Sequence, residues 1–140
     1  MSRIRGSIQV DVPVRTAYGR WTQFEEFPLF MDGVEKVRRL DSERLYWIAE
    51  VGWRRRDWRA RITELVPDRV IAWRSEHGTL TGGRVAFEPL GEAGTRIELD
   101  MEFVPEGIVE RAGDALGLVR RKARGDLRRF KERIEGRLSG

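Results

Sequence analysis

The sequence contains no cysteine and only one histidine, His77. The absence of cysteine excludes disulfide bonds, thiol nucleophiles and thiolate metal sites together. A single histidine leaves almost no room for a histidine-based metal centre or for a proton relay. We therefore predict that the protein has neither a metal site nor a bound cofactor.

Long apolar runs are also absent, because no stretch approaches the roughly 20 residues that a membrane helix needs. The opening residues, MSRIRGSIQV, lack the apolar core of a signal peptide. A chain of 140 residues is long enough for one domain with a real core and too short for two ordinary ones. We predict a soluble, cytoplasmic protein in which residues 1–140 form a single domain.

The net charge of +4 comes entirely from the end of the chain. Residues 1–104 carry 17 basic and 17 acidic residues, and residues 105–140 carry the remaining 10 basic and 6 acidic ones. In that last segment the acidic residues come early and the basic ones late, as a helix dipole favours. This pattern favours a solvated helix face over a nucleic-acid footprint. The alternative is a patch at Arg120–Arg133 for RNA, the ribosome or anionic lipid.

Apolar and polar residues alternate with a period of two in many short segments, and turn residues separate these segments. The clearest case is Ile97–Phe103, and a similar segment, Ile8–Val12, precedes Pro13. Two short helices are predicted after it, one over Val14–Trp21 and one over Phe24–Met31. Strands with one apolar and one polar face indicate an antiparallel sheet that is covered on a single side.

The cover predicted for this sheet is one long C-terminal helix. Apolar residues recur every three or four positions from Ile108 to Leu138, and Leu116 lies on that stripe. The helix would start after Pro105 and contain about 33 residues, so its length would be about 50 Å at about 1.5 Å per residue. Because that length exceeds the width of such a domain, we predict a bend or break in the Gly113–Gly117 region, or an overhang at the C-terminus.

A helix about 10 Å wide cannot cover the whole inner face of a curled sheet. The uncovered part either collapses around large side chains or stays open as a pocket, and the aromatic inner face favours a pocket. We expect almost no ionisable group in its lining. Ser75 and the indole N–H groups are its few polar groups, and Arg56 is placed at its mouth. The candidate ligand-binding residues are Phe27, Phe30, Met31, Trp47, Arg56, Trp58, Trp73, Ser75, Phe87, Leu99, Met101 and Leu116.

Several motifs resemble the START-like, or SRPBCC, superfamily, in its polyketide cyclase/dehydrase-like branch. They are V-x-V-P-V at Val10–Val14, F-E-E-F-P-L-F-M at Phe24–Met31, I-T-E-L-V-P at Ile62–Pro67 and I-A-W-R-S at Ile71–Ser75. Coenzyme-Q-binding proteins and aromatase/cyclases are related to this branch. The resemblance implies an α+β helix-grip fold, in which a curved seven-stranded antiparallel sheet surrounds a long C-terminal helix. It also implies polyketide, isoprenoid-quinone or lipid-like ligands.

Three functions follow from these observations. The preferred one is binding of a hydrophobic small molecule in an internal cavity. The second is a polyketide aromatase/cyclase or dehydratase, which would need Arg56, Ser75 or His77 to converge in the cavity; no catalytic residue is assigned. The third is docking on RNA, the ribosome or a membrane through the basic helix, with nucleic acid disfavoured. The oligomeric state stays open.

Overall fold

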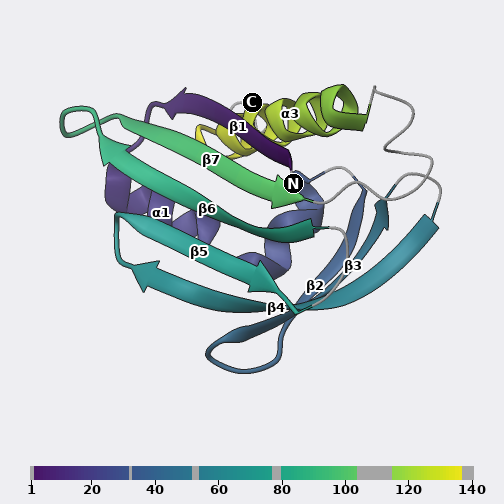
Figure 1. The fold of residues 1–140 in the computed structure, drawn as a ribbon. Coiled ribbons are helices and arrows are strands. Elements are labelled where there is room, and N and C mark those ends of the chain that lie inside the picture. The colour runs from purple at the N-terminus through teal and green to yellow at the C-terminus, as the bar shows by residue number, and fades with distance from the viewer. Residues whose placement is uncertain (1, 32, 52–53, 77–79, 104–114, 137–140) are drawn as a thin grey trace.

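The computed structural model describes residues 2–31, 33–51, 54–76, 80–103 and 115–136 (Figure 1). Its elements, in chain order, are β1 (Ser2–Val10), α1 (Val14–Trp21), the 3-10 helix η1 (Phe24–Leu29), β2 (Val34–Arg39), β3 (Arg44–Val51), β4 (Arg54–Val66), β5 (Val70–Ser75), β6 (Leu80–Pro89), β7 (Thr95–Phe103) and α3 (Ala115–Ile134).

The seven strands form one antiparallel sheet in the order β1-β7-β6-β5-β4-β3-β2. Strands β2 to β7 pair in the order in which they follow one another along the chain, as short turns between strands favour. Strand β1 pairs with β7, so the first two strands of the sequence, β1 and β2, form the two edges of the sheet. Figure 1 shows the sheet curling, with α1 and η1 inside the curve and α3 running beside β1.

The sheet packs closely against α3 through a glycine on its first strand. A Cβ atom at Gly6 would lie 3.3 Å from the Cδ1 atom of Leu127, which is tighter than ordinary packing. Leu127 and Phe130 are both buried on the inner side of α3. The covering helix is therefore confirmed over Ala115–Ile134. It ends before the predicted Leu138, because Gly136 adopts a left-handed φ of 73° that terminates the helix. Residues 104–114 lie outside the described part of the chain. The predicted bend near Gly113–Gly117 stays a prediction.

The first strand differs from its predicted bounds, since it begins at Ser2 and ends at Val10. Its first half was missed because Gly6 stands where the alternation would place an apolar side chain. Arg3 and Arg5 lie on the solvent-exposed face of the sheet, where Arg3 Nε is 3.2 Å from Asp100 Oδ1 on β7. Val12 lies after the strand, and its carbonyl accepts a hydrogen bond from Thr95 Oγ1 at 2.9 Å. Pro13 is the N-cap of α1 and precedes its first turn.

Among the described residues, no helix combines the length and the apolar character that a membrane span requires.

Candidate functional site

One end of the concave face is filled by aromatic side chains. Rings from α1, η1, β6 and α3 meet there, mostly edge to face, as aromatic pairs prefer. The ring centroids of Trp21 and Phe130 are 4.7 Å apart, and those of Phe30 and Phe130 are 5.2 Å apart. Tyr18 contacts Phe87 at 5.5 Å. We call these five residues the aromatic cluster. Phe30 and Phe87, which we predicted to be ligand-binding, belong to this cluster and do not line the cavity described next.

The other end of the concave face is hollow. A cavity of about 280 Å³ lies between α3, η1 and the inner face of the sheet. Its size is close to the lower end of the range for small-molecule sites. The lining residues are Trp21, Phe24, Phe27, Met31, Val34, Leu45, Trp47, Ala49, Glu50, Trp58, Ile62, Ile71, Trp73, Ser75, Gly82, Leu99, Met101, Lys122, Ala123, Asp126 and Leu127.

Three tryptophans form much of the cavity wall. Trp47 and Trp58 are directly opposite each other on β3 and β4, and their rings stack at 5.7 Å with an interplanar angle of 8°. Trp73 on β5 is opposite Gly83 on β6, and a Cβ atom at Gly83 would lie only 2.5 Å from the Trp73 ring. Because glycine has no side chain, the Trp73 indole can lie against β6 at Gly83. Gly83 therefore helps to keep the cavity open.

Two polar atoms in this apolar wall have no hydrogen-bond partner within the described residues. They are the indole Nε1 of Trp47 and the hydroxyl Oγ of Ser75, and both are buried. Leaving a buried donor or acceptor unpaired costs roughly 1–3 kcal/mol. Both residues line the cavity, so a molecule inside it can reach the two atoms. The sequence predicted these polar groups, but only the structure shows that they are unpaired.

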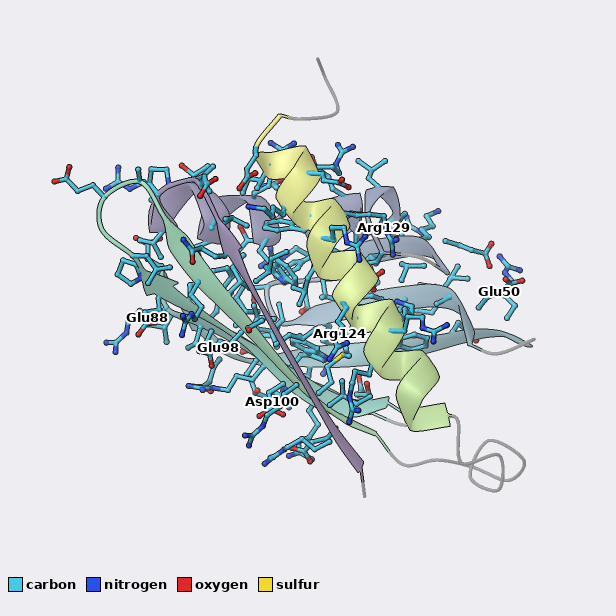
Figure 2. All side chains as sticks on the ribbon, turned by 90° about the horizontal axis from the view of Figure 1, so that it is seen from above. Glu50, Glu88, Glu98, Asp100, Arg124 and Arg129 are labelled. Atoms are coloured by element: carbon cyan, nitrogen blue, oxygen red, sulfur yellow. The ribbon has the colours of Figure 1, made fainter. Side chains whose placement is uncertain are left out.

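The charged residues of the lining lie where α3 meets the rest of the protein. Asp126 is only 7% exposed, and its two carboxylate oxygens are each 2.6 Å from a cation, Lys122 Nζ and Arg129 Nη2. Arg129 also donates from Nε to the Phe30 carbonyl at 2.8 Å, which ties α3 to the end of η1. Glu50 and Lys122 are exposed and thus mark the mouth of the cavity. In Figure 2, Glu50 projects from β3 at the edge of the molecule, and Arg129 extends from α3.

The sequence had predicted a lining with almost no ionisable group, so these charged residues correct that expectation. Eight of the predicted ligand-binding residues line the cavity: Phe27, Met31, Trp47, Trp58, Trp73, Ser75, Leu99 and Met101. The side chains of Arg56 and Leu116, and residue His77, lie outside the described part of the chain. Arg59, Arg61, Arg74 and Arg84 are exposed.

The sequence analysis missed two aromatic residues of the lining, Trp21 and Phe24. They lie on α1 and η1, and the periodicity of a short helix does not show which side of it faces a cavity. Within the described ranges, no group of three or more histidine, cysteine or acidic residues is arranged to hold a metal ion. The arrangement can enclose an apolar molecule, stack against flat rings and donate hydrogen bonds to it.

Comparison with known proteins agrees with this geometry. A family model for "polyketide cyclase / dehydrase and lipid transport" matches residues 10–132. An uncharacterised 17.2 kDa protein of Streptomyces lincolnensis is 43% identical over 138 residues, which cover 98% of this chain and 92% of the relative.

Solved structures with low sequence identity share the fold. The Zhui aromatase/cyclase from Streptomyces sp. R1128 matches with a TM-score of 0.84 at 19% identity, over 98% of this chain and 95% of that one. A START superfamily protein from Mycobacterium smegmatis matches with a TM-score of 0.74 at 14% identity, over 96% and 97% of the two chains. The curled sheet around α3 is thus the helix-grip fold, and the chain belongs to the polyketide cyclase/dehydrase and lipid transport family.

Proposed function

We propose that this protein binds a hydrophobic small molecule of the polyketide, isoprenoid-quinone or lipid-like class in the cavity under α3. The single observation that carries the proposal is a cavity of about 280 Å³ whose wall is mostly apolar and aromatic. A void this large lowers stability unless something fills it, because its lining loses packing contacts. A ligand would recover those contacts, and the protein would shield or deliver that ligand.

A glycine substitution tests the proposal without removing any contact side chain. In Gly83→Ala the new methyl group would overlap the Trp73 ring, so the indole must turn into the cavity. Gly19→Ala is the matched control, because a Cβ atom at Gly19 has nothing within 4 Å. Both variants add one methyl group, and only one of them narrows the cavity.

The measurement has two parts. Mass spectrometry of solvent extracts identifies any molecule that co-purifies with each protein. Titration with an environment-sensitive apolar dye gives its dissociation constant. We expect the wild type and Gly19→Ala to bind the dye equally, and Gly83→Ala to bind it at least about tenfold more weakly. Equal binding by all three proteins would place the ligand elsewhere and refute the cavity proposal.

The enzymatic alternative is a polyketide cyclase or dehydratase acting in the same cavity. It is favoured by one observation, the unpaired hydroxyl of Ser75 in the cavity wall. Cyclisation of a polyketide chain would need further polar groups there, and Arg56 and His77 are the candidates from sequence. Unchanged turnover in Ser75→Ala, Arg56→Ala and His77→Ala, measured on a polyketide chain, would dismiss this alternative.

The outer side of α3 supports a second role, docking on an anionic membrane from which a hydrophobic ligand would be collected. Its four arginines Arg120, Arg121, Arg124 and Arg128, which we call the arginine stripe, are exposed and form no ion pair with the described part of the chain. Figure 2 looks down on α3, with Arg124 extending from it. Anionic lipid attracts such residues by about 1 kcal/mol each.

Sedimentation with vesicles of phosphatidylcholine and phosphatidylglycerol tests this docking. We expect binding that weakens steeply with added salt, and that is lost when Arg120, Arg124 and Arg128 are all changed to Gln. Changing Arg38, Arg59 and Arg74 to Gln is the control. These arginines are exposed on the sheet, away from α3, and their substitution removes the same amount of positive charge. Equal loss in both triple variants, or binding to RNA but not to vesicles, would refute membrane docking.

A further inference from the structure

The two unpaired polar atoms of the cavity lie on strands that flank β4. Trp47 on β3 is opposite Trp58, and Ser75 on β5 is opposite Ala60, two residues further along β4. Neighbouring strands are about 4.8 Å apart and successive residues about 3.4 Å apart along a strand, so the backbones of Trp47 and Ser75 lie about 12 Å apart on the sheet. Both side chains line one cavity, and one molecule of a few fused rings would reach both.

The chemistry of the two atoms restricts what can satisfy them. An indole N–H only donates a hydrogen bond, so Trp47 requires an acceptor. A serine hydroxyl donates or accepts, so Ser75 takes either a carbonyl or a hydroxyl. The stacked rings of Trp47 and Trp58 offer a flat wall beside these atoms. The matching partner is thus an oxygen atom on a flat ring system.

The charges of the cavity further restrict the ligand. The carboxylate of Asp126 already holds Lys122 and Arg129, and the other charged residue of the lining, Glu50, is acidic. The one cation among the described lining residues, Lys122, already pairs with Asp126, so a ligand carboxylate beside Trp47 and Ser75 would be buried without a free cation from that lining. An unpaired buried charge is far more costly than a neutral group. The oxygen must therefore belong to a neutral carbonyl or hydroxyl group.

We infer that Trp47 and Ser75 determine specificity, because they select neutral, flat molecules that carry a carbonyl or hydroxyl oxygen over hydrocarbons of the same shape. This inference rests on the proposed binding function and adds the ligand class to it. The two residues act as hydrogen-bonding partners in a site that is otherwise shaped by apolar contact.

Three ligands of one shape test the inference: fluorenone, its parent hydrocarbon fluorene, and fluorene carboxylate. Calorimetry or displacement of an apolar dye gives the dissociation constants. We expect the wild type to bind fluorenone about 5–10 times more tightly than fluorene, which is the contribution of one hydrogen bond. The carboxylate should bind most weakly of the three.

Variants then assign this preference to the two residues. Trp47→Phe keeps an aromatic ring without the N–H group, and Ser75→Ala keeps the volume without the hydroxyl. Because fluorenone carries one oxygen, at least one of the two variants should weaken fluorenone binding severalfold, and the double variant should abolish its preference over fluorene. Fluorene binding should stay within about twofold in all of them. Tyr46→Phe is the control, because the neighbouring hydroxyl of Tyr46 donates to Asp57 Oδ2 at 2.6 Å on the other face of the sheet. It should change neither affinity.

Each outcome decides a separate question. Equal binding of fluorenone and fluorene by the wild type means that water satisfies the two atoms, so the specificity inference is wrong while cavity binding stands. Tightest binding of the carboxylate refutes the neutral ligand. Binding of none of the three, combined with equal dye binding by Gly83→Ala and wild type, removes the proposed function and the inference together. If a variant fails to fold, the wild-type ratio still decides.

Discussion

The two ends of the concave face are built from similar residues and have opposite outcomes. At one end the aromatic cluster fills the space, with ring centroids such as those of Trp21 and Phe130 only 4.7 Å apart. At the other end Trp47, Trp58 and Trp73 line a hollow. The difference lies in the cover. Tyr18 of α1 and Phe130 of α3 fill the first end, whereas η1 and residues 122–127 of α3 cover the second end without filling it. Apolar composition therefore does not distinguish core from cavity, whereas the helices above the sheet do.

The largest effect is expected from a truncation in the filled end. Phe130 is 1% exposed and contacts the rings of Trp21 and Phe30, so Phe130→Ala would leave a large void among rigid rings. We expect the free energy of unfolding to fall by about 3–5 kcal/mol, measured by urea denaturation. Met101→Ala is the comparison from the cavity wall, where one side already lacks packing partners, and it should lose roughly half as much or less. Equal losses would remove the distinction between the two ends.

Enlarging one alanine in each end tests the same contrast from the opposite direction. Ala17 on α1 is fully buried in the core, whereas Ala49 on β3 is buried and lines the cavity. Ala17→Leu should destabilise by about 1–3 kcal/mol through overpacking, as judged by thermal or urea unfolding. Ala49→Leu should be neutral or stabilising by up to about 1 kcal/mol and should weaken binding of the apolar dye. A large loss of stability in Ala49→Leu would show that the cavity has no free volume at that position.

Much of the fold could be predicted because strand alternation needs no knowledge of partners. Residues 95–103 alternate without a break, and β7 is found there. Strand β4 departs from simple alternation, since a bulge between Ile62 and Glu64 shifts its register against β5. Beyond the bulge, Leu65 and Val66 are 43% and 41% exposed although both are apolar. A bulge depends on the neighbouring strand, and no local pattern in the sequence shows it.

Most of the candidate site that was predicted comes from the sheet, where alternation places Trp47, Trp58 and Trp73 on the inner face. Phe27, in η1, was also predicted correctly, whereas Phe30 and Phe87 are buried but belong to the filled end. Whether such a residue lines a cavity depends on where α1, η1 and α3 dock, which is a property of the packed molecule. The charged contribution of α3 was missed for the same reason, because periodicity separates apolar from polar faces and does not show ion pairs at their border.

An intermediate effect is expected from Asp126, which lies at the border between the cavity and the filled end. Asp126→Asn would weaken two contacts of 2.6 Å to half-exposed cations, so we expect a loss of about 1–2 kcal/mol in urea denaturation. Arg129 would also hold the Phe30 carbonyl less firmly, and dye should leave the cavity faster in stopped-flow measurements. Arg124→Gln on the exposed side of α3 is the control. Unchanged dye release in Asp126→Asn would show that this ion pair does not limit access.

The smallest effect concerns the two tyrosines, one in the filled end and one on the outer face behind the cavity wall. Burial raises the pKa of Tyr18, with the nearby Asp68 adding to it, whereas the hydrogen bond to Asp57 is the main cause that raises the pKa of Tyr46. Both should ionise above the ordinary value of about 10, as followed by near-ultraviolet absorbance. In Asp57→Asn only the Tyr46 transition should move down.

The raised pKa of Tyr46 also sets the pH range in which its hydrogen bond to Asp57 stabilises the fold. A folded-state pKa above the unfolded value means that the folded state favours the protonated phenol. Its contribution is complete below the unfolded pKa of about 10 and is lost as the pH rises through the higher folded value. The difference in unfolding free energy between the wild type and Tyr46→Phe should therefore stay constant up to about pH 10 and shrink above it. If Asp57→Asn lowered both tyrosine transitions, burial would not be what separates the filled end from the outer face.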